Sequence, residues 1–182
     1  MATDRKSVKL TNLEVQNAVG ALNGSERLVI GDDGPVGVRE PGVFDWPMST
    51  VPAWRLQQIA TALNQSASEY GKVLEAKRRD CHESYTDDEG EKKRRWREIV
   101  TVADGVELTG IQAFAAAKST LDDERVEIKV ARKVKASELV AAYRRHMAAE
   151  KKKKVDDDDD VLPTRVLFAL APFIDMDLKE KD

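Results

Sequence analysis

One stretch of the sequence, from Ser49 to Cys81, constrains the fold more than any other. Its apolar residues recur at alternating spacings of four and three, which is the period of a helix with one apolar face: Leu56, Ala60, Leu63, Ala67, Tyr70 and Leu74. Pro52 suits a first helical turn, and Ile59 and Val73 widen the face so that several elements can cover it. Because an α-helix rises 1.5 Å per residue, some thirty residues would span about 45 Å. We therefore expect a long central helix on which the rest of the chain packs.

The part of the chain before this helix carries signals for a short helix and a hairpin. Thr11–Glu14 matches a capping box, and the helix that it begins should end at Gly24. Residues 24–48 are rich in glycine and proline, so we expect an arm or a hairpin there, with strands at Leu28–Ile30 and Val36–Arg39. Phe44 and Trp46 lie in the same segment, and we expect them to pack over the start of the long helix rather than to bind a ligand.

The part of the chain after this helix alternates between strand and helix signals. We expect a strand at Trp96–Val102, a turn at Ala103–Gly105, and a helix at Thr109–Leu121 with Ile111, Phe114 and Ala115 facing inward. Alternation predicts a strand from Val126 to Val130, continuing to Val134, with Glu127, Lys129 and Arg132 toward water. Ser137 should cap a helix that ends at Glu150 with Leu139, Ala142, Tyr143 and Met147 on one face, and Pro163–Leu170 should form a last helix. The apolar end, Ala171–Ile174, should dock on the core.

These elements predict one α+β domain over residues 1–182, with a long central helix, shorter packed helices and a small antiparallel β-sheet. Residues 151–160 hold a run of lysines followed by a run of aspartates. Because like charges repel one another, we expect a charged, mobile loop there. The Asp156–Asp160 run could attract Mg²⁺ or Ca²⁺ loosely, but it lacks the spaced ligands of a calcium loop, so we expect it to be solvated.

Composition and motifs argue against several functional classes. The net charge is −3, from 30 basic and 33 acidic residues, so no overall field favours nucleic acid or an acidic partner. A single cysteine, Cys81, excludes an internal disulfide and fits a reducing compartment. No apolar run reaches membrane length and no signal peptide is evident, so we expect a soluble cytoplasmic protein.

Cys81, His82 and His146 lack the spacing of a zinc site. The glycine-rich turn at residues 31–37 lacks the Lys-Ser/Thr of a phosphate loop, and no nucleophile elbow occurs. We therefore expect neither a cofactor nor enzymatic activity.

One basic cluster stands out from this background. Lys77, Arg78 and Arg79 close the long helix, and a second group surrounds an aromatic ring: Lys92, Lys93, Arg94, Arg95, Trp96 and Arg97. Cations beside an aromatic ring are typical of surfaces that bind single-stranded nucleic acid. Acidic residues are interleaved, however, and nearly cancel the local charge: Asp80, Glu83, Asp87, Asp88, Glu89 and Glu91. We therefore favour a solvated mixed-charge turn, with Trp96 as the first inward residue of a strand.

Short motifs along most of the chain resemble one group of viral proteins. The segments that carry this resemblance are Leu10–Glu14, Ala21–Asn23, Ala53–Gln57, Leu63–Asn64, Tyr70–Lys72, Val126–Val130 and Leu167–Ile174. Together they are similar to small proteins encoded by tailed phages and prophages. The residue 31–47 arm and the Lys/Asp tract depart from that pattern. The resemblance implies a phage-encoded accessory or virion-associated protein and assigns no catalytic residue.

From these observations we expect a non-enzymatic protein that acts through protein–protein contacts. Its partner would be a virion protein or a host protein. The protein itself would be found in the host cytoplasm or in the virion. The alternative is a nucleic-acid-binding accessory protein that uses the Lys77–Arg97 region.

Overall fold

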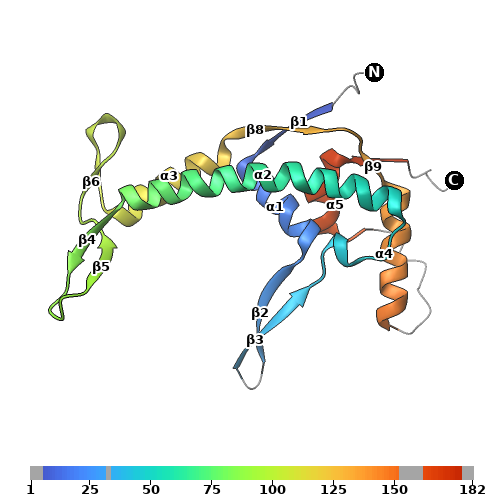
Figure 1. Ribbon diagram of the computed structural model, residues 1–182, viewed down its shortest axis with the longest axis horizontal. Helices are drawn as coiled ribbons and strands as arrows, with labels where there is room; N and C mark the ends of the chain where they lie inside the picture. The colour runs from blue at the N-terminus through green and yellow to red at the C-terminus, as the bar shows by residue number, and fades with distance from the viewer. Residues whose placement is uncertain (1–5, 32–33, 152–161, 178–182) are drawn as a thin grey trace.

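The computed structural model describes residues 6–31, 34–151 and 162–177. One helix, α2 (Thr50–Asp80), runs through nearly the whole length of the molecule (Figure 1). The body of the protein surrounds its first half, and an arm formed by strands β4–β7 and helix α3 lies along its second half. The fold is α+β, as predicted. The predicted Lys/Asp tract falls outside the described residues, apart from Lys151.

Helix α2 begins and ends where the sequence predicts. Ser49 is the N-cap residue, and the N–H of Cys81 at the C-cap donates to the carbonyl oxygens of Lys77 and Arg78, each at 3.2 Å. Its buried residues all lie in the first half of the helix: Pro52, Leu56, Ile59, Ala60 and Leu63. Farther along, Leu74 is only half-buried and Val73 is 44% exposed. The prediction that Val73 widens the apolar face is therefore wrong, because only one side of the second half is covered.

The body is built from a two-stranded sheet that lies over a pair of helices. Strand β1 (Lys6–Thr11) pairs antiparallel with β8 (Arg125–Val130), and Val8 lies opposite Ile128. Helix α1 (Asn12–Asn23) packs beside α2. The predicted capping box at its start is confirmed, since the Glu14 carboxylate accepts from the N–H of Thr11 at 2.7 Å. The buried Asn12 side chain donates to the carbonyl of Leu121 at 2.7 Å and so ties α1 to the end of α3.

The C-terminal elements close the core at the far end of α2 from the arm. Helix α4 (Ala136–Lys151) buries Leu139 and Ala142, and α5 (Thr164–Leu170) leads into a 3-10 turn, η4 (Ala171–Phe173). Strand β10 (Ile174–Asp175) then pairs in parallel with β9 (Val134–Lys135), so the apolar end docks as predicted. The prediction of Ser137 as cap is wrong. Ser137 is the second residue of α4, and both its N–H and its hydroxyl donate to Asp177, at 2.9 and 2.7 Å.

The predicted hairpin in residues 24–48 is present. Strand β2 (Ser25–Gly31) pairs antiparallel with β3 (Gly34–Glu40), and a short 3-10 turn, η1 (Val43–Asp45), follows. At its base the chain crosses itself so closely that a Cβ on Gly42 would lie 2.1 Å from the Gly24 nitrogen. Trp46 is buried and packs on Tyr143 of α4, with ring centroids 5.0 Å apart, whereas Phe44 is 37% exposed. The predicted packing role is therefore confirmed for Trp46, whose ring partner lies on α4, and it is not confirmed for Phe44.

The arm at the C-terminal end of α2, which is not the arm predicted at residues 24–48, differs most from the prediction. It consists of strands β4 (His82–Thr86), β5 (Lys92–Trp96), β6 (Val100–Thr101) and β7 (Glu107–Leu108), followed by α3 (Gly110–Asp123). The predicted continuous strand at 96–102 is instead two pieces: Trp96 ends β5, and Val100–Thr101 forms β6. Between them the N–H of Arg97 donates to the Cys81 carbonyl, and the Arg97 carbonyl accepts from the N–H of Gly110. The predicted turn at Ala103–Gly105 is confirmed as η2, with positive φ at Asp104 and Gly105.

Helix α3 begins after Thr109, whose hydroxyl accepts from the N–H of Gln112. Only one side of the helix is covered, so Ala113 is buried and Phe114 half-buried. The prediction that Ile111 and Ala115 face inward is wrong, since both are exposed. The predicted small sheet is divided into five two-stranded pairings within the described residues, and the β9–β10 pairing is parallel rather than antiparallel.

Candidate binding surfaces on the arm

The basic cluster predicted from the sequence lies on the β4–β5 hairpin at the far end of α2 (Figure 1). Side chains alternate between the two faces of a strand, so β5 divides its own cations. Lys92 and Arg94 share one face with Trp96, and they lie opposite Thr86, Ser84 and His82 of β4. Lys93 and Arg95 lie on the other face, opposite Tyr85 and Glu83.

The cations on the second face are paired within the hairpin. The Arg95 Nε donates to the Glu83 carboxylate at 2.7 Å, and its guanidinium lies over the Tyr85 ring, 5.3 Å from the centroid. Glu83 raises the pKa of Arg95 above its usual value. Lys93 forms an ion pair with Asp87 and a longer one of 3.8 Å with Glu91. Phosphate groups would therefore compete with existing carboxylate partners for these two side chains.

Trp96 is half-buried and in contact with two other rings. Its ring centroid is 3.9 Å from that of His82 and 5.6 Å from that of Phe114 on α3. The His82 ring is itself held, because its Nδ1 lies 2.7 Å from the Arg78 carbonyl oxygen. Trp96 thus joins the hairpin to α3. It packs, as predicted, although it is the last residue of its strand and not the first.

Two other basic residues of the region have partners of their own. Arg97 donates from Nε to the His82 carbonyl at 3.0 Å, and Arg78 forms a long ion pair of 3.9 Å with Glu75. Across the described part of the chain, Lys92 and Arg94 form no ion pair with a carboxylate. These two side chains, two residues apart on one exposed face, are therefore the cations of β5 that are available for a nucleic-acid contact.

The hairpin turn gathers carboxylates that sequence reasoning did not single out. Ligand oxygens of Asp87, Glu89 and Glu91 lie within 4.8 Å of one another. Asp87, however, is already engaged: one oxygen accepts from the N–H groups of Glu89 and Glu91, and Lys93 pairs with the other. These hydrogen bonds, of which the one from Lys93 has the largest effect, hold the pKa of Asp87 below its usual value. The cluster therefore fastens the turn, and spacing in the sequence could not separate this role from ion binding.

The potential soft metal ligands do not form a site. Cys81 is buried at the end of α2, and burial raises the pKa of its thiol, which is the opposite of an activated nucleophile. His82 stacks on Trp96, and His146 lies on α4 in the body. Within the three described segments, Asp87, Glu89 and Glu91 are the only trio of potential metal ligands that comes together.

Three large aliphatic side chains in the segment between β5 and the first turn of α3 are exposed. Ile99 precedes β6, Val106 precedes β7 and Ile111 is the second residue of α3, and their side chains are 62%, 51% and 58% exposed. We call these three residues the tip cluster, after the place of their segment beyond the C-terminal end of α2. Sequence reasoning missed it, because Ile111 fits the apolar period of α3 and was assigned to the core.

No helix among the described residues is long and apolar enough to cross a membrane. The arm carries two candidate surfaces for partner binding, the tip cluster and the face of β5 with Lys92 and Arg94. Comparison with known proteins adds nothing to this choice, because no family model, curated protein or solved structure gives a significant match to the chain.

Proposed function

We propose that this is a non-enzymatic protein that acts through protein–protein contacts, with the tip cluster as its binding surface. The observation that carries the proposal is the exposure of three large aliphatic side chains, Ile99, Val106 and Ile111, in one short segment of the arm. Large apolar side chains in water are unfavourable, and a surface on which several of them are exposed is one that a partner can cover. The arm that carries this segment projects from the body (Figure 1).

The state of the titratable groups also favours a binding role over a catalytic one. The Cys81 thiol has a raised pKa, and the Tyr70 hydroxyl, whose pKa burial raises to about 12, donates to Asp122 at 2.5 Å. The Asp122 carboxylate is also held by Lys118. These groups are therefore fixed in their resting protonation states by structural contacts rather than poised to exchange protons near neutral pH.

The resemblance to small proteins of tailed phages supports a phage-encoded accessory role. On this proposal the partner is either a virion protein or a host protein whose activity is modulated, and the protein is found in the host cytoplasm or in the virion. The aliphatic chemistry of the tip cluster fits an apolar patch or groove on that partner.

Affinity capture from infected cells, followed by mass spectrometry, tests the proposal. The variant replaces the tip cluster by serine at Ile99, Val106 and Ile111, and the control replaces Val51, which is 55% exposed on the first turn of α2. Both should melt as the wild type does, because neither change touches the core. Loss of a partner in the tip variant alone is the expected result. Equal recovery of every partner by the wild type and the tip variant would refute the proposal.

The alternative function, nucleic-acid binding, has one specific observation in its favour: Lys92 and Arg94 lie on the face that carries Trp96, and no carboxylate among the described residues forms an ion pair with either of them. Fluorescence anisotropy with single-stranded DNA and RNA decides between the two. We expect no binding at physiological salt. Micromolar binding that weakens steeply with salt, and that is lost on charge reversal at Lys92 and Arg94, would establish the alternative.

A further inference from the structure

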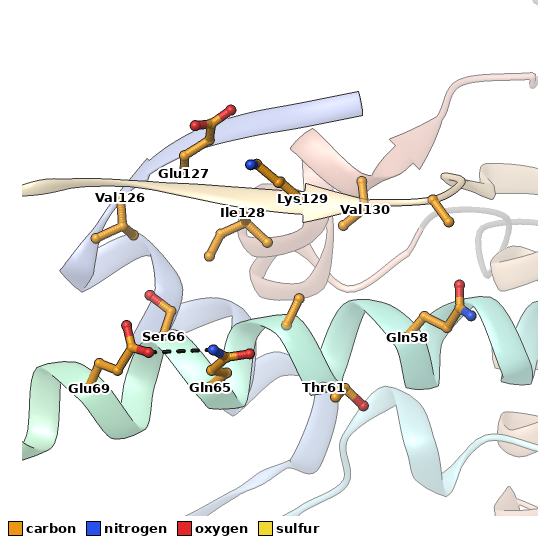
Figure 2. Close-up of a pocket in the computed structure, with 12 residues that line it drawn as sticks. Gln58, Thr61, Gln65, Ser66, Glu69, Val126, Glu127, Ile128, Lys129 and Val130 are labelled. Carbon is orange, nitrogen blue, oxygen red and sulfur yellow. Dashed lines mark hydrogen bonds between the residues drawn. The ribbon is translucent and has the colours of Figure 1, made fainter. Parts of the chain in front are cut away.

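A groove on the body lies between α2 and the outer edge of β8, well away from the tip cluster (Figures 1 and 2). Its volume is about 670 Å³. Helix α2 forms its floor through Gln58, Thr61, Ala62, Gln65, Ser66 and Glu69, and β8 forms its wall through residues 126–130, followed by Ala131. Figure 2 shows Val126, Ile128 and Val130 pointing down toward α2, while Glu127 and Lys129 point up and away from it.

The groove exists because two helices lie beneath only two strands. Paired strands are about 4.8 Å apart, whereas packed helices are about 8–10 Å apart. Seen from the groove, helix α1 lies behind α2, and β1 lies behind β8 (Figure 2). The helix layer is consequently wider than the strand layer, and part of α2 extends as a ledge beyond β8. One further strand would fill this width.

The edge of β8 that faces the groove offers the backbone groups for such a strand. Its other edge pairs with β1, and within the described residues nothing pairs with the groove edge. In an antiparallel ladder alternate residues direct their N–H and C=O groups to each side, so the groove edge carries a row of unpaired donors and acceptors. A bound strand would satisfy them.

The side chains beside this edge specify the chemistry of the occupant. On the upper face, Glu127 lies opposite Lys9 of β1, whereas Lys129 lies opposite Ser7 and has no carboxylate across the strand pair. A carboxylate on a third strand, opposite Lys129, would supply that cross-strand pair. On the lower face, Val126 of β8 and Ala62 of α2 are half-buried apolar residues of the groove lining, which small aliphatic side chains of a bound strand would cover.

We propose that this groove binds an extended, acidic segment of a partner protein as a third strand antiparallel to β8. Its small aliphatic side chains lie over α2, and a carboxylate lies opposite Lys129. A second copy of the chain cannot supply its own β8 as this strand. Pairing the two β8 strands at about 4.8 Å would bring the two α2 helices closer than the 8–10 Å that helix packing requires. The site does not depend on the function proposed for the tip cluster.

Three fluorescein-labelled peptides test this proposal by anisotropy with the full-length protein. The acidic peptide contains Val-Glu-Val-Ser-Val between glycines, and the other two carry Gln or Lys in place of Glu. We expect the acidic peptide to bind about fivefold more tightly than the lysine peptide, with the glutamine peptide between them. Substitution of the exposed Lys129 by glutamate should reverse that order while leaving the melting temperature unchanged.

Two controls establish that the peptide binds as a strand in the groove. N-methylation of alternate peptide amides should abolish binding, because it removes the donors to β8. Ser66→Phe fills the floor of the groove and should also abolish it, whereas Ser68→Phe, on an exposed part of α2 outside the groove, should not.

Three results would overturn the proposal. The first is the absence of binding by any of the peptides up to about 1 mM. The second is an unchanged order of affinities in K129E. The third is a dimer in sedimentation experiments that the acidic peptide dissociates, because a second copy would then be the occupant.

Discussion

Replacing Leu63 by alanine tests which half of α2 belongs to the core. Leu63 is 0% exposed, so the substitution removes fully buried carbon atoms and leaves a space that the neighbours fill only in part. The lost transfer free energy is about 2 kcal/mol, at about 0.8 kcal/mol for each buried carbon group, and the cavity adds to it. We therefore expect the free energy of unfolding to fall by about 3–4 kcal/mol. For a chain of this size, that corresponds to a drop in Tm of roughly 6–16 °C.

The matched control is Val73→Ala on the same helix. Val73 is 44% exposed, so its truncation should cost less than about 1 kcal/mol. Urea unfolding followed by circular dichroism measures both variants, and their m values should equal that of the wild type. Similar losses for the two variants would refute the division of α2 into a buried first half and an exposed second half.

Three further predictions concern individual contacts. Gly42→Ala should destabilise the protein by at least about 2 kcal/mol in urea unfolding, because its Cβ would meet the Gly24 backbone at 2.1 Å, whereas Gly37→Ala, with nothing within 4 Å, should be nearly neutral. Asp177→Ala should cost about 1 kcal/mol and speed hydrogen exchange in the first turn of α4, because the Asp177 carboxylate accepts the N–H and hydroxyl of Ser137; unchanged exchange would contradict that role. Burial raises the pKa of Tyr70 from its usual 10.0 to about 12 in the folded state, so its contribution to stability should be present below pH 10 and lost as the pH rises to about 12. Tyr70→Phe should remove that loss and delete a tyrosine titration near pH 12 in absorbance, and a wild-type absorbance titration without that component would disprove it.

Local signals in the sequence predicted the elements whose determinants are themselves local. The Thr11–Glu14 capping box lies within four residues, and the bounds of α2 follow from its period and from the caps at its ends. The same period could not distinguish Leu63 from Leu74, which occupy equivalent positions on the helix. Their different burial depends on which elements reach each half of α2, and that is set by contacts distant in sequence.

The arm was the hardest part to predict for the same reason. Strand β5 contains four consecutive cations, so it lacks the apolar alternation that marks a strand. Pairing across the hairpin stabilises it instead, through the Glu83–Arg95 ion pair and the His82–Trp96 ring contact. The groove beside β8 could not be predicted from the sequence either. The alternation of Glu127 and Lys129 indicated a water-facing side, but a free strand edge is a property of the assembled sheet.

The position of α2 gives the molecule the mechanics of a beam that is clamped at one end. Its 31 residues form one uninterrupted rod, of which Leu56, Ile59 and Leu63 are held in the core while the other end carries the tip cluster. A sideways force on the C-terminal end of α2 would therefore act mainly on the packing of these three side chains. A pull along the helix axis would load all three together. The floor of the groove, at Gln65 and Ser66, lies where α2 passes from the part that the core buries to the part along which α3 packs.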